Sequence, residues 1–201
     1  MAGFVRRYTT EQIDSYGTTA TVWDDLRFPA TSVKLGPTNP PTEQLYKGGQ
    51  VLSFANNNNN RIFFVAQLPH SYKFDTDLKF HIHITLPVSG LGLGAQNVKF
   101  NMTYSWAGIN GVFPAETTIT ATRDVQNDVL DTHIIFPIDT VLTANKGTAN
   151  GNAGVSDMLI CSLIRDTTVA NNYANPVYFL EADFHYQIDT IGSDDEYIKR
   201  Y

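Results

Sequence analysis

The sequence predicts an all-β protein, an antiparallel two-sheet sandwich of the jelly-roll type. In several segments apolar and polar side chains alternate, which is typical of strands with one buried face. Gly, Asn and Pro collect between these segments, where turns need them, and no long stretch has the period of a helix. Two facing antiparallel sheets bury such strands. A jelly roll is favoured over an immunoglobulin-like sandwich because the loops are long and the Cys-Trp-Cys pattern is absent.

The composition indicates a surface that meets other proteins. Of the 201 residues, 42% are hydrophobic and only 17% are charged, so Asn, Thr, Ser and Gly must cover much of the surface. The formal net charge is −6 and no basic stripe is present, which argues against nucleic-acid binding. No run approaches the ~20 apolar residues of a membrane-spanning helix. We therefore expect neither nucleic acid nor a membrane as a partner.

The chain divides into three parts in this interpretation. Residues 1–20 form an N-terminal arm, residues 21–192 form a single jelly-roll sandwich domain, and residues 193–201 form a C-terminal tail. Ser193 and Glu196 have the spacing of a capping box, which is compatible with a short helix in the tail. The arm and the tail are the parts expected to reach a partner.

Residues 21–49 are predicted to be a long connection. Three prolines between positions 37 and 41 keep part of it extended. Long ordered loops in compact domains are usually functional or packed on a partner. We therefore expect Trp23, Phe28 and Tyr46 to attach this segment to the sandwich or to a neighbouring molecule.

Residues 50–55 and 61–68 are predicted to form one hairpin, because the segment 56–60 consists of five Asn residues that suit a turn. The segment 62–65 is apolar on both faces, as expected for a central strand between two packed layers. The same pattern makes residues 158–164 a second central strand.

The clearest alternation lies in residues 78–86 and 97–106. We expect the apolar face of each segment to lie in the core, and we expect these two strands to pair with each other. The apolar face of the first consists of Leu78, Phe80, Ile82, Ile84 and Leu86.

Three further segments complete the predicted sheets. Residues 117–121 and 129–138 are predicted strands, and residues 177–190 are the longest strand candidate. Cys161 lies in an apolar run and is expected to be a buried hydrophobic residue instead of a reactive thiol. One face of the longest strand is expected to carry Tyr178, Leu180, Ala182, Phe184, Tyr186 and Ile188.

Two histidines raise the sharpest chemical question in this sequence. His81 and His83 lie on the polar face of the 78–86 strand, about 7 Å apart, a separation that can serve one metal ion. His185, next to Asp183 on another strand, could supply a third ligand. The His-x-His pattern is similar to that of cupins, but cupins place a Glu three or four residues later and this sequence has none there. We favour hydrogen bonding of these histidines across a sheet or subunit seam, and predict no metal, cofactor or catalytic residue.

Six short segments run in order through the chain: Trp-Asp-Asp-Leu-Arg at 23–27, Tyr-Lys-Gly-Gly at 46–49, Leu-Pro-His-Ser-Tyr-Lys at 68–73, His-Ile-His at 81–83, Tyr-Ser-Trp at 104–106 and Asp-Phe-His-Tyr-Gln-Ile-Asp-Thr-Ile-Gly-Ser at 183–193. Together they resemble a family of virion-associated structural proteins of tailed phages and environmental viruses. The resemblance implies a capsid decoration or cement protein of a bacteriophage, made in the host cytoplasm and located in the virion. It implies the major capsid protein as a partner and carries no catalytic residues.

The predicted function is therefore that of a non-enzymatic structural component of a virus particle, which stabilises the shell by subunit–subunit contacts. Jelly-roll subunits commonly form symmetric oligomers, and by analogy with capsid proteins we expect a homo-oligomer, a trimer. The residues expected at the contacts are Trp23, Arg27, Tyr46, Tyr197 and Tyr201. Two alternatives stay open: a host- or glycan-binding jelly-roll module in a spike or tail, and a cupin-like metal-dependent enzyme.

Overall fold

The computed structural model describes residues 22–138, 146–147, 154–193 and 195–196. The predicted arm at 1–20 and the interaction residues Tyr197 and Tyr201 lie outside the described residues. Within the described residues, no helix is long and apolar enough to cross a membrane.

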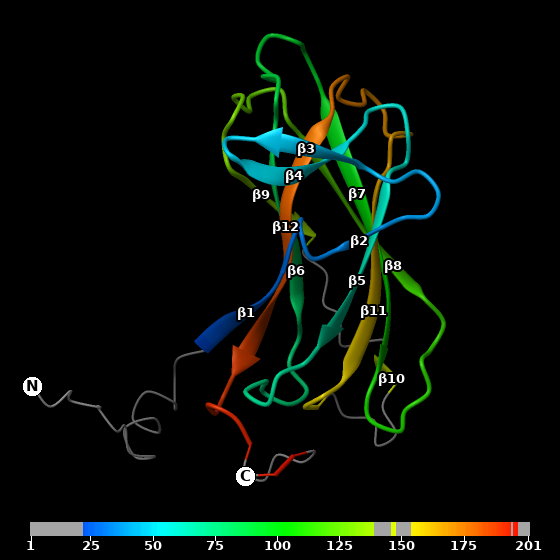
Figure 1. Ribbon diagram of the computed structural model, residues 1–201, viewed down its shortest axis with the longest axis vertical. Helices are drawn as coiled ribbons and strands as arrows, with labels where there is room; N and C mark the ends of the chain where they lie inside the picture. The colour runs from blue at the N-terminus through cyan, green and yellow to red at the C-terminus, as the bar shows by residue number, and fades with distance from the viewer. Residues whose placement is uncertain (1–21, 139–145, 148–153, 194, 197–201) are drawn as a thin grey trace, which may run out of the picture.

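Strands make up the regular structure of the described residues (Figure 1). They are β1 (Val22–Pro29), β2 (Lys34–Leu35), β3 (Thr42–Tyr46), β4 (Gly49–Phe54), β5 (Arg61–Gln67), β6 (Lys79–Thr85), β7 (Asn97–Ala107), β8 (Thr117–Asp124), β9 (Ile134–Ile138), β10 (Lys146–Gly147), β11 (Met158–Arg165) and β12 (Val177–Ile188).

The strands form two facing sheets. One, called here the β12 sheet, has the order β3-β4-β12-β6-β9, with β1 also paired to β12. The other, called here the β11 sheet, has the order β10-β7-β11-β5-β2, with β8 also paired to β7. Numbered along the chain from β4, and with β10 left out, the main strands lie in the orders 1-8-3-6 and 2-7-4-5, which define a jelly roll. The predicted fold class is confirmed.

The core lies between the two sheets and is mostly aromatic and branched aliphatic. The apolar face predicted for residues 78–86 is fully buried, from Leu78 to Leu86, as are the alternate apolar side chains of β7. Trp106, at the end of β7, is completely buried and its Nε1–H donates to Asp157 Oδ2 at 3.0 Å. Cys161 is buried as predicted, and this burial raises the pKa of its thiol.

The predicted pairing of the two clearest strands is wrong. β6 pairs with β12 and β9, whereas β7 pairs with β11 and β8 in the opposite sheet. An alternating pattern reports that one face is buried, but it does not report which strand lies alongside. In a jelly roll consecutive strands often cross from one sheet to the other, and β6 and β7 do so.

The predicted hairpin between β4 and β5 is wrong for the same reason. β4 belongs to the β12 sheet and β5 to the β11 sheet, so the Asn-rich segment crosses the sandwich. Asn60 organises the crossing, because its Oδ1 accepts the Ala55 N–H at 2.6 Å and its Nδ2 donates to the Pro40 carbonyl at 2.8 Å.

The predicted connection at 21–49 contains strands. β1 runs antiparallel to β12 from the Val22–Ile188 pair to the Pro29–Glu181 pair. Its side chains are mostly exposed, so it lacks the buried apolar face that sequence periodicity detects. The strands predicted at 117–121 and 129–138 are present as β8 and β9, with different ends.

An irregularity in β12 changes the predicted division of its faces. The register with β6 shifts between Phe179 and Glu181, as at a β-bulge. Phe179 is therefore buried in the core, and Tyr178, predicted to share a face with Phe184, is only partly buried and packs against Tyr46 at 5.3 Å between ring centroids. Beyond the bulge, Glu181 and the next alternate residues face outward, as predicted.

The strands that are apolar on both faces do not lie between two packed layers. β11 is central within its sheet as predicted, between β7 and β5. However, Ile160 in β11 is 50% exposed and Val65 in β5 is 52% exposed. The described residues place no third layer over this side of the sandwich, so the outer face of the β11 sheet has an open apolar patch along β5 and β11.

Candidate functional site

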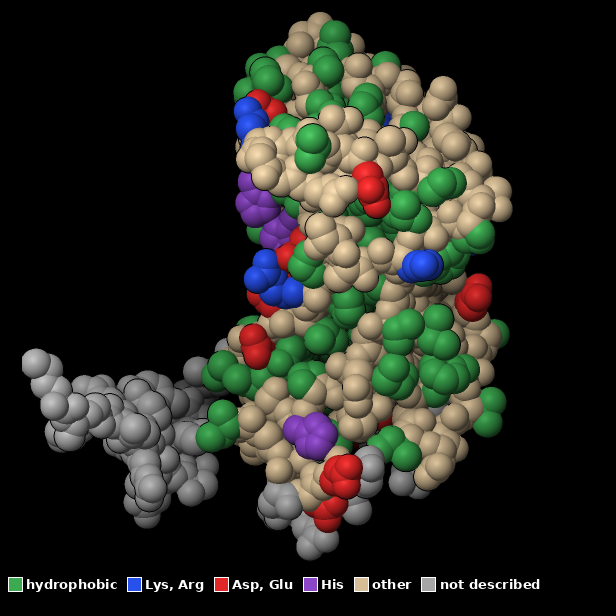
Figure 2. Space-filling view, viewed as in Figure 1, with side chains coloured by type: hydrophobic (Ala, Val, Ile, Leu, Met, Phe, Trp, Pro, Cys, Tyr) green, Lys and Arg blue, Asp and Glu red, His purple; other side chains and the backbone are tan. Residues whose placement is uncertain are grey.

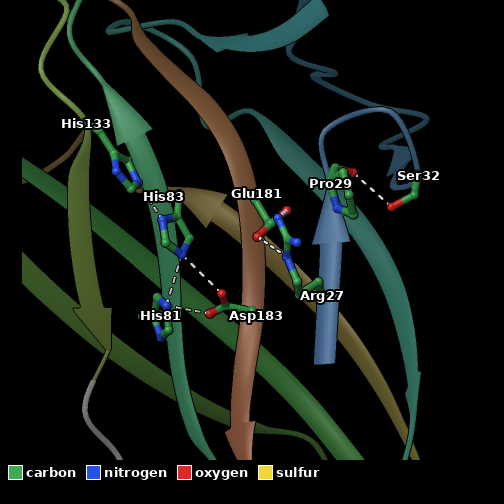
Figure 3. Close-up of polar contacts among 8 residues, drawn as sticks. All are labelled: Arg27, Pro29, Ser32, His81, His83, His133, Glu181 and Asp183. Atoms are coloured by element: carbon green, nitrogen blue, oxygen red, sulfur yellow. Dashed lines mark hydrogen bonds and ion pairs between the residues drawn. The ribbon is translucent and has the colours of Figure 1, made fainter. Parts of the chain in front are cut away.

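A group of histidines and one carboxylate lies on the outer face of the β12 sheet (Figure 3). β6 supplies His81 and His83, and β12 supplies Asp183, which is the direct cross-strand partner of His81. His133, just before β9, and His185, in β12, lie against them. These five residues are called here the histidine cluster. Pairing of β6 with β12 brings them together, because directly opposed side chains lie about 5 Å apart.

Asp183 is at the centre of the cluster. Its Oδ1 lies 2.6 Å from His81 Nε2, and its Oδ2 lies 3.1 Å from His83 Nε2. The two Nε2 atoms are themselves 3.1 Å apart. The side chain of Asp183 is only 3% exposed, against 7% for His81 and 18% for His83. One buried carboxylate thus faces two imidazoles that open toward the surface.

The contact between Asp183 Oδ1 and His81 is close but lacks hydrogen-bond geometry. Oδ1 is a buried oxygen that accepts no hydrogen bond from the described residues, although His81 Nε2 lies beside it. Oδ2, by contrast, lies in hydrogen-bond geometry with His83 Nε2. A buried carboxylate oxygen without a donor is energetically costly, so this arrangement is incompletely satisfied by the protein alone.

Two further imidazoles support the cluster. His133 stacks on His83, with ring centroids 4.9 Å apart, and His133 Nε2 lies 2.6 Å from His83 Nδ1. His185 packs edge-on against His81 with ring centroids 4.3 Å apart, and its Nε2 lies 2.9 Å from Asp25 Oδ1. Sequence reasoning named His81, His83 and His185 but missed His133, which stands outside any alternating segment.

Glu181 lies beside the cluster but is occupied by another partner. Arg27 in β1 donates from Nε and one terminal nitrogen to the two oxygens of Glu181, each at 2.8 Å (Figure 3). The hydrogen bonds from Arg27 and its proximity to Glu181 raise the pKa of the guanidinium above its ordinary value. Arg27 was predicted as an interaction residue, and the structure gives it this partner within the chain.

The other predicted interaction residues within the described chain also lie in the β12 sheet. Trp23 is 39% exposed, and Lys79 Nζ lies 5.2 Å from the centre of its ring. Tyr46 donates its hydroxyl to Asp131 at 2.6 Å, and its partial burial is the main cause of its raised pKa. The structure therefore places Trp23 and Tyr46 in one sheet, and their role in contacts stays a prediction.

A second surface feature lies on the opposite sheet. A groove of about 370 Å³ runs along the outer face of the β11 sheet, beside the loop that follows β7. Figure 2 shows hydrophobic side chains gathered on the side of the molecule formed by β5 and β11. The residues that give the groove its character are Arg61, Phe63, Phe113, Glu116, Ile160 and Ser162.

Fold and surfaces together define an all-β jelly-roll protein with a histidine cluster on one sheet and a groove of mixed aromatic and polar lining on the other. No family model matches the chain, and no curated protein matches it. Solved structures do show similarity. One is a chain in the structure of the infectious bursal disease virus Gx strain, with a TM-score of 0.40 and 8% sequence identity; the match covers 83% of this chain and 32% of that one.

Two other similar structures come from different classes of protein. One is the CBM36-1 domain of a multidomain xylanase from the hindgut metagenome of Trinervitermes trinervoides, at TM-score 0.39 and 10% identity, covering 81% of this chain and 96% of that one. The other is the enzymatically active domain of tailspike protein 4 of bacteriophage CBA120, at TM-score 0.35 and 9% identity, covering 83% and 19%. The chain spans about a third of the bursal disease virus protein and a fifth of the tailspike domain.

Proposed function

We propose that this chain is a non-enzymatic structural component of a virus particle, a decoration or cement subunit that associates with copies of itself and docks on the major capsid protein. One observation carries the proposal: the outer face of the β11 sheet carries an open apolar patch where β5 and β11 lie side by side. Val65 and Ile160 are direct cross-strand partners, and about half of each side chain is exposed. Phe113, 43% exposed, and Val112, 85% exposed, extend the apolar surface in the loop after β7.

An exposed apolar surface of this kind is typical of a protein–protein interface. Covering the exposed half of a Val or Ile side chain contributes about 1 kcal/mol each. The surface lies on the face of a sheet, so a second copy of the same chain can pack on it face to face, as the two sheets of the sandwich already do. The sequence resemblance to virion-associated proteins and the low fraction of charged residues support the same role.

The test is a substitution on this face with a matched substitution on the other sheet. Val65→Asp places a carboxylate where association would bury it, which we expect to weaken self-association by about 100-fold or more. Leu45→Asp, at a position in β3 that is 81% exposed, is the control and should associate as the unmodified chain does. Sedimentation velocity measures self-association, and co-sedimentation with capsids that lack this protein measures docking.

Each outcome of these measurements either supports or contradicts the proposal. An oligomeric chain that binds capsids, and loses self-association in Val65→Asp but not in Leu45→Asp, supports it. A chain that stays monomeric at high concentration and does not bind capsids contradicts it. Equal association of the two variants also contradicts the assignment of the interface to the β11 sheet.

A second candidate function is carried by the groove. A host- or glycan-binding module needs an aromatic platform with polar groups around it, and the groove combines Phe63 and Phe113 with Arg61 and Glu116. A glycan array probed with the chain tests this role, and Phe113→Ala should remove any signal. An array without signal, together with firm capsid binding, decides for the structural role.

A further inference from the structure

The ligand atoms of three side chains in the histidine cluster converge on one small volume. His81 Nε2 lies 2.6 Å from Asp183 Oδ1, His83 Nε2 lies 3.1 Å from Asp183 Oδ2, and the two Nε2 atoms are 3.1 Å apart. In a tetrahedral zinc site with bonds of about 2.0–2.1 Å, neighbouring donor atoms are about 3.3 Å apart. We propose that these three side chains bind a divalent transition-metal ion of the Zn²⁺ class, which goes beyond the structural role proposed above.

Hydrogen bonding alone does not satisfy the three groups. If both Nε2 atoms carry hydrogens that point at Asp183, two N–H groups also face each other across 3.1 Å. If one Nε2 instead accepts a hydrogen from the other, it has no hydrogen left for the carboxylate. Either arrangement leaves a poor contact, and Asp183 Oδ1 accepts no hydrogen bond. A cation between the three lone pairs resolves both problems at once.

The surroundings allow the imidazole of His83 to take the form that a metal needs. His133 Nε2 lies 2.6 Å from His83 Nδ1, so the Nδ1–H of His83 can donate to His133. His83 then carries its hydrogen on Nδ1 and presents a free lone pair on Nε2 toward Asp183. Histidine ligands in metal sites are commonly oriented by such a hydrogen bond from the second ring nitrogen. His133 is therefore a positioning residue for His83.

Candidates for the fourth position are limited by existing contacts. His185 offers a ring nitrogen within 4.8 Å of the donor atoms of His81 and Asp183, and one of its two ring nitrogens, Nε2, already contacts Asp25. Glu181 is equally near His83 and Asp183, but its two oxygens are both held by Arg27. His185 or water therefore completes the coordination more readily than Glu181.

The donor set selects the class of ion. Imidazole nitrogens suit Zn²⁺ and the neighbouring transition metals, whereas Ca²⁺ and Mg²⁺ require several oxygen ligands. The three proposed ligands are two imidazoles and one carboxylate, and Asp183 is almost fully buried. His83, 18% exposed, is the side from which an ion can enter.

The experiment uses the full chain, stripped with a chelator and dialysed. Isothermal titration with Zn²⁺ should show one ion bound per chain, and Co²⁺ in its place should give the strong visible absorption of a low-symmetry nitrogen-ligated site. His83→Gln should abolish binding. His133→Gln should weaken it about 10- to 100-fold, as removal of an outer hydrogen-bond partner does in other sites.

His70→Gln is the matched control, because His70 contacts Ser193 and takes no part in the cluster. Circular dichroism establishes that each variant is folded, and the partly exposed positions 83 and 133 were chosen because their loss leaves the core intact. A stripped chain that takes up no Zn²⁺ overturns the proposal. Unchanged affinity in His83→Gln, or equal loss in His70→Gln, also overturns it. The Val65→Asp variant should bind Zn²⁺ as the unmodified chain does. A failure of the proposed assembly role can therefore be told apart from a failure of the proposed metal site.

Discussion

Replacement of Arg165 by Met is predicted to destabilise the fold strongly. Arg165 ends β11 and is completely buried, and its guanidinium forms no ion pair with the carboxylates of the described residues. It donates to the carbonyl oxygens of Phe54 at 2.8 Å, Asn175 at 2.9 Å and Tyr173 at 2.8 Å. These acceptors belong to the end of β4 and to the segment that leads into β12, so one side chain ties the two sheets together.

The magnitude follows from the carbonyl groups that the substitution leaves behind. Each buried acceptor without a donor costs about 1–3 kcal/mol, which gives roughly 3–9 kcal/mol for three of them. Removing a buried charge returns part of this cost, because burial lowers the pKa of Arg165 to about 10 and its Nε has no hydrogen-bond partner. The expected net loss in the free energy of unfolding is about 3–5 kcal/mol.

Urea denaturation followed by tryptophan fluorescence measures this loss. Arg61→Met is the control, because Arg61 is exposed and such surface changes usually stay within about 0.5 kcal/mol. If Arg165→Met unfolds at the same urea concentration as the unmodified chain, the reasoning from carbonyl satisfaction is refuted.

Three further predictions rest on single contacts. Gly90→Ala should lower the free energy of unfolding by about 2–3 kcal/mol, because a Cβ there would lie 1.9 Å from the Val125 carbonyl oxygen. Gly49→Ala is the control and should lower it by less than about 1 kcal/mol, because the nearest atom to its Cβ would be 3.7 Å away. Equal melting temperatures of the two variants would contradict this. Asp166 has a pKa below its ordinary value, chiefly through its hydrogen bond with Lys99. Asp166 therefore binds a proton less readily in the folded chain than in the unfolded chain, so its contribution to stability is present above about pH 4 and is lost as the pH falls further. The unmodified chain should exceed Asp166→Asn in free energy of unfolding by about 2 kcal/mol at pH 7. This difference should shrink when thermal unfolding is measured at acidic pH. Cys161 should react with a thiol reagent only after denaturation, because it is buried and its thiol pKa is raised; rapid labelling of the native chain would show otherwise.

The parts of the fold that depend on local pattern could be predicted from the sequence. Alternation in residues 78–86 identified a strand with a buried face, because burial of every second side chain leaves its mark in one segment. The partners of that strand could not be predicted, because pairing depends on long-range topology. β1 escaped detection because only two of its eight side chains, Leu26 and Phe28, pack on the core, which is too few to show a period.

The same limit applies to the histidine cluster. The sequence placed His81 and His83 on one face and named His185 as a possible companion. Only the pairing of β6 with β12 shows that Asp183 is the residue that faces both imidazoles. His133 could not be found, because its place beside His83 depends on the pairing of β6 with β9. Apolar residues on both faces of β5 and β11 were equally ambiguous, since a buried layer and an open interface require the same side chains.

The strand β12 has a neighbour along almost its whole length on one side. β4 pairs with its first residues, β1 pairs with it from Glu181 to Ile188, and the Ala30 N–H donates to the Leu180 carbonyl at 2.9 Å between them. An unpaired strand edge is a template on which other chains can add strands and aggregate. β1 therefore covers the part of the β12 edge that β4 leaves unpaired. With the backbone of β12 occupied, a neighbouring molecule can contact this strand only through its side chains, which can encode a specific partner.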